Sequence, residues 1–158
     1  MKKVLILYAS STGNTEEIAS LLEQHLDTKV LDITSKNLEM TEVDVKELKE
    51  YDGILFGTYT YDDGDLPFET DVFNDNLQNV DLNGKVIGLF GSGDTAYFQF
   101  CEAVDTMKNE FKCRGSIVID HVVKVDLFPD EKEELDAIKE LGFLFQKALS
   151  AHAIQSSS

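Results

Sequence analysis

The segment VLILYASSTGNTEEI, residues 4–18, decides the fold of this 158-residue chain. Its first five residues, 4–8, are continuously apolar, which is typical of a strand that is covered on both faces of a sheet. Six small polar residues, 10–15, then lead into Glu16 and Glu17, where a helical pattern begins. A buried strand that passes through a small polar loop into a helix predicts the first unit of a parallel α/β sheet.

The rest of the chain repeats this alternation of strand and helix. Further short apolar runs rich in β-branched residues lie at 30–33, 54–56, 86–90 and 117–119. Helical spacing fills most of the gaps, with a weaker helix over 66–77 and one helical turn in 41–51. The apolar stripes of the stronger helices are Ile18, Leu21, Leu22 and His25; Phe100, Val104, Met107 and Phe111; and Leu135, Ile138, Gly142, Phe145 and Leu149.

This alternation predicts right-handed crossovers and a doubly wound α/β fold with helices on both faces of a parallel sheet. The length fits one domain, which we place at residues 1–150, followed by a flexible C-terminal tail at 151–158. The apolar run 4–9 is shorter than a signal-peptide core or a membrane span, so we expect a cytoplasmic protein.

The charge balance restricts the partners. Fourteen Lys and Arg stand against 30 Asp and Glu, a formal net charge of −16. Such a field repels phosphate backbones and anionic lipids and attracts basic proteins, so we expect neither nucleic acid nor a membrane as a partner. Cys101 and Cys113 are too far apart on one helix, about 18 Å, for a disulfide. No Cys or His pair has the spacing of metal ligands, so no metal site is expected.

Ligands of doubly wound sheets bind beyond the carboxyl ends of the strands, so the segments that follow the strands are candidate sites. The first segment offers hydroxyls and backbone N–H groups at the start of a helix, which suits a phosphate. The residues of this segment are Ser10, Ser11, Thr12, Gly13, Asn14 and Thr15. It contains no Lys or Arg, and the GxxxxGK[ST] pattern is absent, which argues against a nucleotide triphosphatase. An ordinary helix cap is the alternative.

Two further segments combine aromatic with small or acidic residues. Residues 57–67 follow the third apolar run and contain Tyr59 and Tyr61, and residues 91–98 follow the fourth and contain Tyr97. Two aromatic loops beside one anion loop indicate a flat ring held between side chains, with its phosphate at the helix. Ordinary half-buried packing of the tyrosines is the alternative for each loop taken alone.

The three segments, in this order and at this spacing, resemble the FMN-binding loops of flavodoxins, and the similarity extends from Lys3 to about Leu149. The compact length resembles the short-chain group of that family. The resemblance implies a five-stranded parallel sheet in the order 2-1-3-4-5. It also implies non-covalently bound FMN and a low-potential one-electron carrier that is not an enzyme, with no catalytic residues.

The resemblance assigns roles to individual residues. The hydroxyl and amide side chains of 10–15 would bind the phosphate, with Thr58 near the phosphate or ribityl chain. Asp94 would face the pyrimidine edge, while Tyr61 and Tyr97 would cover the two faces of the flavin. The cofactor-binding residues expected on this basis are Ser10, Ser11, Thr12, Gly13, Asn14, Thr15, Thr58, Tyr59, Thr60, Tyr61, Asp62, Gly64, Ser92, Gly93, Asp94, Tyr97, Phe98 and Cys101.

Two positions depart from the family pattern. Tyr61 stands where many members carry tryptophan, and the chain contains no Trp. Asp62 stands where glycine is frequent, and a side chain there disfavours positive φ by about 1 kcal/mol or more. We therefore expect the change Asp62→Gly to shift the reduction potentials.

The acidic residues point to the partners. On this fold Glu16, Glu17, Asp62, Asp63, Asp65, Glu69 and Asp71 would crowd the rim of the site. We expect a monomer that exchanges electrons with a basic-surfaced NAD(P)H-dependent flavodoxin or ferredoxin reductase and with acceptor redox enzymes. An FMN-dependent NAD(P)H or quinone reductase is the alternative function. A phosphorelay receiver domain is disfavoured because the first apolar run ends without acidic residues.

Overall fold

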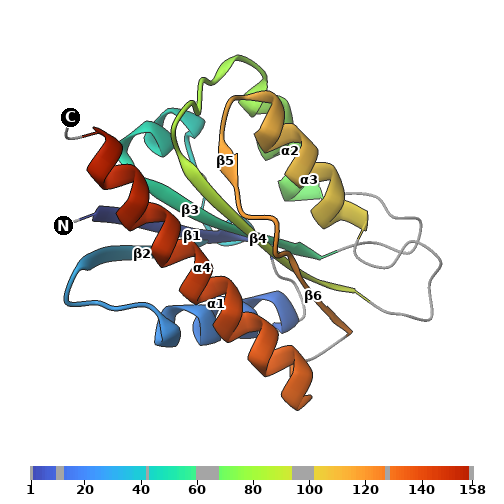
Figure 1. Cartoon of the computed structure of the whole chain (residues 1–158). Helices are drawn as coiled ribbons and strands as arrows, with labels where there is room; N and C mark the ends of the chain where they lie inside the picture. The colour runs from blue at the N-terminus through green and yellow to red at the C-terminus, as the bar shows by residue number, and fades with distance from the viewer. Residues whose placement is uncertain are drawn as a thin grey trace.

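The computed structural model describes residues 2–9, 13–41, 43–59, 68–93, 102–126 and 129–156. A parallel sheet in the order β2-β1-β3-β4-β5 forms the centre of the molecule, with helices on both of its faces (Figure 1). Every strand pair is parallel. The predicted order is confirmed. The strands are β1 (Lys2–Tyr8), β2 (Leu31–Asn37), β3 (Gly53–Tyr59), β4 (Val86–Gly93), β5 (Ile117–Val118) and β6 (Val123–Asp126).

The last position of the sheet differs from the five-strand prediction, because two short strands occupy it. β5 pairs with β4 at Val86↔Ile117, and β6 pairs with β4 at Phe90↔Val123. The residue offset between partners therefore grows from 31 to 33 (117 − 86 and 123 − 90). The chain therefore has two extra residues between β5 and β6 relative to β4. Its pairing with β4 stops after β5 and begins again at β6, as at a β-bulge. The prediction stopped at residue 119 because polar residues interrupt the apolar run there.

The strand β1 shows how the core is divided. Val4, Ile6 and Tyr8 pack with the helices α1 (Asn14–His25) and α4 (Lys132–Ser156). Leu5 and Leu7 point to the opposite face and pack with α2 (Phe68–Asn76) and α3 (Glu102–Cys113). Both sets are buried, so the continuous apolar run is explained by helices on each face of the sheet.

The described parts of the helices follow the predicted pattern with three differences, and Phe100 lies outside the described residues. His25 is exposed at the end of α1, although its spacing placed it on the apolar stripe. Leu135 is also exposed, near the start of α4. Helix α4 continues to Ser156, into the segment that the sequence suggested as a tail, and the mobility of that segment stays a prediction. Two 3₁₀ turns, η1 (Val45–Glu50) and η2 (Leu77–Asn79), complete the connections.

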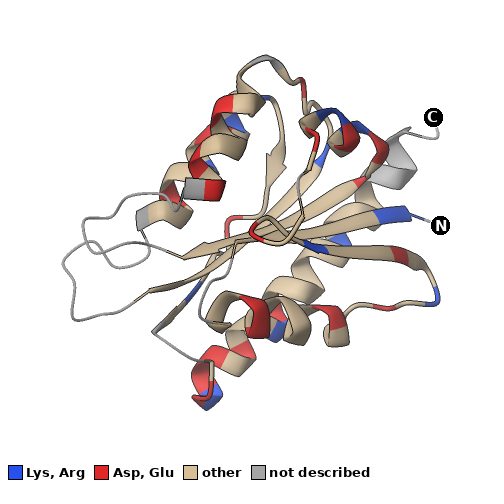
Figure 2. Cartoon of the chain, turned by 180° about the vertical axis from the view of Figure 1, so that it is seen from behind, with Lys and Arg blue, Asp and Glu red and all other residues tan. Residues whose placement is uncertain are grey.

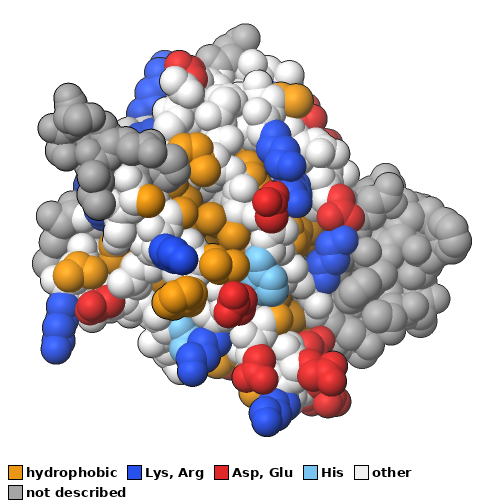
Figure 3. All heavy atoms as spheres, in the orientation of Figure 1, with side chains coloured by type: hydrophobic (Ala, Val, Ile, Leu, Met, Phe, Trp, Pro, Cys, Tyr) orange, Lys and Arg blue, Asp and Glu red, His pale blue; other side chains and the backbone are white. Residues whose placement is uncertain are grey.

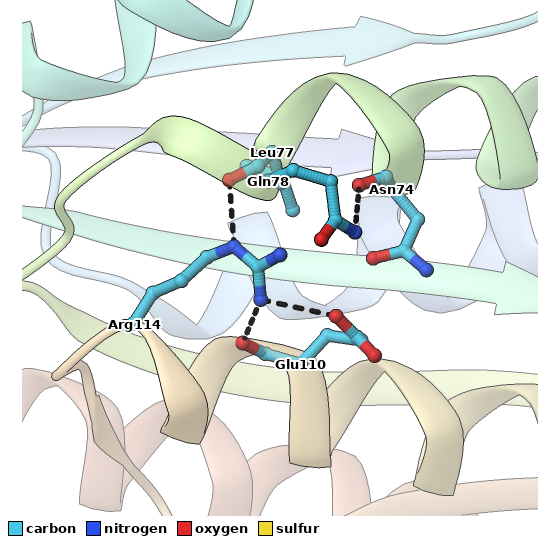
Figure 4. Close-up of polar contacts among 5 residues, drawn as sticks. All are labelled: Asn74, Leu77, Gln78, Glu110 and Arg114. Atoms are coloured by element: carbon cyan, nitrogen blue, oxygen red, sulfur yellow. Dashed lines mark hydrogen bonds and ion pairs between the residues drawn. The ribbon is translucent and has the colours of Figure 1, made fainter.

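Arg114 ties α3 to the end of α2 (Figure 4). Its Nε donates to the carbonyl of Leu77 at 2.7 Å, and its Nη1 donates to the carbonyl and to the carboxylate of Glu110 at 2.6 and 3.0 Å. The side chain is only 9% exposed. The buried guanidinium has two carbonyl acceptors and one carboxylate acceptor, and charge-assisted hydrogen bonds of this kind are stronger than neutral ones. This contact fixes the two helices on the α2 and α3 face.

Acidic residues occur on the helices on both sides of the sheet, and basic residues are fewer (Figure 2). Cys113 is a free, exposed cysteine at the end of α3, and Cys101 lies outside the described residues. None of the helices in the described ranges combines the length and apolar composition that a membrane span requires. The described side chains also include no group of three His, Cys, Asp or Glu residues that could hold a metal ion.

Candidate functional site

The candidate site lies at the edge of the sheet where the carboxyl ends of β1, β3 and β4 meet. Seven of the expected residues are described there: Gly13, Asn14, Thr15, Thr58, Tyr59, Ser92 and Gly93. The other expected residues lie outside the described residues, and their roles stay predictions. These are Ser10, Ser11, Thr12, Thr60, Tyr61, Asp62, Gly64, Asp94, Tyr97, Phe98 and Cys101.

Gly13 is the N-cap of helix α1, with φ of 91°. Its carbonyl accepts the first helical hydrogen bond, from the N–H of Glu17 at 3.0 Å. The left-handed backbone suits glycine, and a glycine cap has no side chain that could bond to the first turn. The N-cap position itself is therefore a glycine and not a Ser or Thr, whereas the hydroxyl residues 10–12 lie outside the described residues. N–H groups of a first helical turn lack partners inside the helix, so this end of α1 suits an anion such as a phosphate.

A buried pair of hydroxyls joins the first candidate segment to the third. Thr15 Oγ1 lies 2.8 Å from Ser92 Oγ, and both residues are almost fully buried. Thr15 belongs to the first turn of α1, whereas Ser92 lies near the end of β4. The sequence predicted both residues, and the structure brings them together across 77 positions of the chain.

A second buried pair of hydroxyls lies where the middle candidate segment, residues 57–67, begins. Thr58 Oγ1 donates to the carbonyl of Tyr59 at 3.1 Å and lies 3.0 Å from Thr70 Oγ1 in helix α2. Either hydroxyl can be the donor within the Thr58–Thr70 pair. Sequence reasoning missed Thr70. Its spacing from the buried Phe73 and Leu77, three and seven residues on, is the signal that could have placed it on the inner face of its helix.

Tyr59 has a partner that the sequence analysis did not identify. Its Oη donates to Glu39 Oε1 at 2.8 Å. Glu39 lies in the turn after β2, and the N–H of the neighbouring Leu38 donates to the carbonyl of Tyr8 at 2.7 Å. The turn after β2 is therefore attached to the ends of both β1 and β3, and no local pattern marks Glu39 for this contact.

Close backbone approach explains Gly91, which lies just before Ser92. A Cβ at residue 91 would lie 2.1 Å from Val104 Cγ2 and 2.5 Å from the carbonyl oxygen of Thr58. These distances are far inside van der Waals contact, so helix α3 and the end of β3 can approach β4 only if residue 91 is glycine. The glycine thus sets the distance between the second and third candidate segments.

The electrostatic environment of this edge is acidic. Burial raises the pKa of Tyr8, at the end of β1, and the nearby carboxylate of Glu16 raises it further. Glu16 and Asp71 are exposed, and Glu17 and Glu69 are half-buried. These four form the described part of the acidic rim predicted above, whereas the acidic residues at 62, 63 and 65 lie outside the described residues.

The family follows from comparison with known proteins. Residues 6–140 match the family model described as flavodoxin. The chain belongs to the flavodoxin family. The sequence resemblance is therefore confirmed, and the Gly13 cap and the two hydroxyl pairs belong to a flavodoxin fold.

Three comparisons place this flavodoxin among its relatives. It is 39% identical to probable flavodoxin 1 of Bacillus subtilis over 146 residues, 91% of each chain. It is similar to the crystal structure of oxidised flavodoxin 2 from Bacillus cereus, with a TM-score of 0.86, 41% identity and coverage of 92% of this chain and 98% of that one. It shares its fold with a Fusobacterium nucleatum flavodoxin bound to flavin mononucleotide (TM-score 0.76, 23% identity, 93% and 98% coverage).

Proposed function

We propose that this flavodoxin binds FMN without a covalent bond and works as a low-potential one-electron carrier, not as an enzyme. The observation that supports the proposal most directly is the glycine-capped start of α1 beside the Thr15–Ser92 pair. The relative from Fusobacterium nucleatum, of the same fold, is bound to FMN. FMN supplies the redox chemistry when it is bound, and the protein supplies binding, orientation and electrostatics.

The described residues fit the phosphate end of FMN. Gly13 caps α1 and has no side chain of its own, so the start of the helix, with the positive end of its dipole, can lie close to a dianion. The hydroxyls of Thr15 and Ser92 are buried beside this turn and hold two segments at the same place. Neutral donors suffice there because the helix end already favours negative charge.

The ring would lie toward the other two segments. Thr58 and Tyr59 fix the root of residues 60–67, through Thr70 and Glu39 respectively. We assign the ring contacts to the predicted residues of this segment and of 94–101, with Tyr61 and Tyr97 on the two faces. Aromatic side chains exclude water from the ring and leave the acidic rim as the dominant nearby charge.

The charge of the protein supports a low potential and a basic partner. Added electrons meet a formal net charge of −16 and the phosphate of the cofactor, which makes reduction unfavourable. The same field attracts a basic reductase, so we propose an NAD(P)H-dependent flavodoxin or ferredoxin reductase as donor and redox enzymes as acceptors. We also propose that the protein is a cytoplasmic monomer.

The test starts with the visible spectrum of the purified protein and an anaerobic titration with dithionite. A yellow complex with one FMN per chain that is reduced in two separate one-electron steps supports the proposal. A colourless chain that takes up no added FMN overturns it. Steady-state oxidation of NAD(P)H by the protein alone would instead favour the reductase alternative.

A matched pair of variants links the cofactor to the start of α1. Gly13 and Gly84 have φ of 91° and 82°, and a Cβ at either position would meet nothing within 4 Å. Gly13→Ala and Gly84→Ala should therefore carry the same backbone strain, about 1 kcal/mol. Only Gly13→Ala should weaken FMN binding, because only Gly13 caps α1. Equal FMN affinities of the two variants would contradict the placement of the phosphate.

A further inference from the structure

A groove with an apolar floor lies between the turn after β2 and helix α2. Its volume is about 280 Å³, enough for one or two side chains of a partner. Met40 and Val72 line it and are 81% and 41% exposed, two of the five exposed large hydrophobic residues among those described. The residues that line the groove are Leu38, Glu39, Met40, Thr41, Val43, Glu69, Val72, Phe73 and Asn76.

The groove shares a wall with the candidate cofactor site. Glu39 lines the groove and also accepts the hydrogen bond of Tyr59, at the end of β3. Leu38, the next lining residue, is bonded to the carbonyl of Tyr8 at the end of β1. Anything that fills the groove therefore lies against the same edge of the sheet that would hold the flavin.

The charge of the groove is negative. Glu39 and Glu69 line it, and a second hollow that shares Val43 and Asn76 with it adds Asp44 and Glu47, of which Glu47 is paired with Lys36 Nζ at 3.1 Å. No Lys or Arg occurs among the described residues that line either hollow. An apolar floor with carboxylates at its rim complements an apolar side chain flanked by basic ones.

A groove on another face of the molecule has different chemistry. It lies between α1 and α4, has a volume of about 440 Å³, and is lined by Lys139, Lys147 and the exposed Phe143. Figure 3 shows this face, where hydrophobic side chains lie among basic, acidic and histidine side chains. His25, at the carboxyl end of α1, also lines it, so this groove lies away from the edge where α1 begins. It provides an internal control for the first groove.

We propose that the Met40 and Val72 groove is the docking site for the basic redox partner of this carrier. An apolar side chain of the partner packs against Met40 and Val72, and neighbouring Lys or Arg side chains of the partner face Glu39 and Glu69. The flexible thioether of Met40 can adapt to side chains of different shape. The inference rests on the proposed function, because it names the surface by which an electron carrier meets its partner.

The test uses oxidised cytochrome c, a lysine-rich haem protein, as a probe of the partner's chemistry. It is titrated into the 15N-labelled, FMN-loaded chain, and the backbone amide signals report which residues lie near the paramagnetic haem. The signals of residues 38–41 and 69–76 should broaden first. Broadening confined to α4 near Phe143, or no binding at low ionic strength, would overturn the proposal.

Two double variants give the matched comparison. Met40→Gln with Glu69→Gln changes one apolar and one acidic side chain of the groove, neither of which makes a contact assigned to FMN. Phe143→Gln with Glu133→Gln makes the same changes on α4. We expect the first pair to raise the Kd for cytochrome c about tenfold and the second to leave it within about twofold. If both double variants change the Kd for cytochrome c equally, the assignment of the docking site to this groove is refuted.

The absorbance of bound FMN, measured on each sample, separates the two proposals. If the chain takes up no FMN, the proposed function itself is wrong. A chain that binds FMN and cytochrome c, with equal Kd for both double variants, retains the function and fails only the docking site. Glu39 is left unchanged in these variants because its loss would also remove the Tyr59–Glu39 hydrogen bond at the end of β3.

Discussion

The Thr15 and Ser92 hydroxyls allow stability and cofactor binding to be separated experimentally. Their oxygens are 2.8 Å apart, and the two residues are 1% and 3% exposed. Removal of one hydroxyl leaves the other buried without this partner, which costs about 1–3 kcal/mol. We therefore expect Thr15→Val and Ser92→Ala each to lower the free energy of unfolding of the FMN-free chain by about that amount.

The double variant should behave differently in the two assays. Replacement of both partners by apolar groups of similar shape is nearly neutral for folding, so the loss of stability should fall short of the sum of the single losses by about 1 kcal/mol or more. FMN affinity should not recover, because the site has then lost both hydroxyls. With a net hydrogen bond worth about 1 kcal/mol, the Kd for FMN should rise by roughly five- to tenfold or more.

The measurements are urea unfolding followed by far-ultraviolet circular dichroism and FMN titration followed by flavin fluorescence. Thr34→Val, on the edge strand β2, controls for the exchange of threonine for valine itself. If the stability loss of the double variant equals the sum of the two single losses within about 0.5 kcal/mol, the two hydroxyls act independently. That result would refute the reasoning. If the double variant binds FMN as tightly as the unmodified chain, the two hydroxyls do not contribute to the cofactor site.

Three further predictions concern the sheet edge and the helices. Gly91→Ala should lower the free energy of unfolding by about 1–3 kcal/mol, because its Cβ would lie 2.1 Å from Val104 Cγ2; an unchanged urea midpoint would contradict this close approach. Arg114→Lys keeps the charge and loses the forked contacts, so the midpoint should fall by an amount equivalent to about 1–2 kcal/mol, and a wild-type midpoint would argue against a structural role. Burial and Glu16 raise the pKa of Tyr8, so the folded state holds this proton more tightly than the unfolded state. Its contribution to stability is present below pH 10 and is lost as the pH rises through the raised pKa; Tyr8→Phe should weaken that alkaline decline, and an identical decline in both proteins would count against it.

The central strands could be predicted from the sequence because burial on both faces leaves a continuous apolar run. Residues 4–8 and 86–90 are such runs, and both are strands in the structure. The edge strand β2 was predicted at 30–33 but runs over Leu31–Asn37, because an edge strand exposes polar side chains that hide its length. The division of the last strand escaped prediction for a related reason, since the offset against β4 depends on pairing and not on local composition.

The site could be predicted only where one short segment carries the signal. Gly13 and Thr15 belong to a loop whose small polar residues follow a strand, so their positions were predictable. Glu39 and Thr70 were not, because each acts through one hydrogen bond to a residue 20 or 12 positions away. A contact of this kind depends on how the sheet brings the ends of two strands together, which local periodicity does not encode.

The contacts at this edge also explain why the cofactor segments start from fixed positions. Thr15 is bonded to Ser92, and Thr58 is bonded to Thr70. Each of the three candidate segments is therefore anchored at one end to a buried residue of α1, β3, β4 or α2. A site whose supporting residues are already ordered loses less conformational entropy when a ligand binds. The Tyr59–Glu39 bond extends the same support to the groove beside α2. Cofactor binding and partner docking would then depend on one rigid sheet edge, so disruption of a hydroxyl pair should weaken FMN binding before it unfolds the sheet.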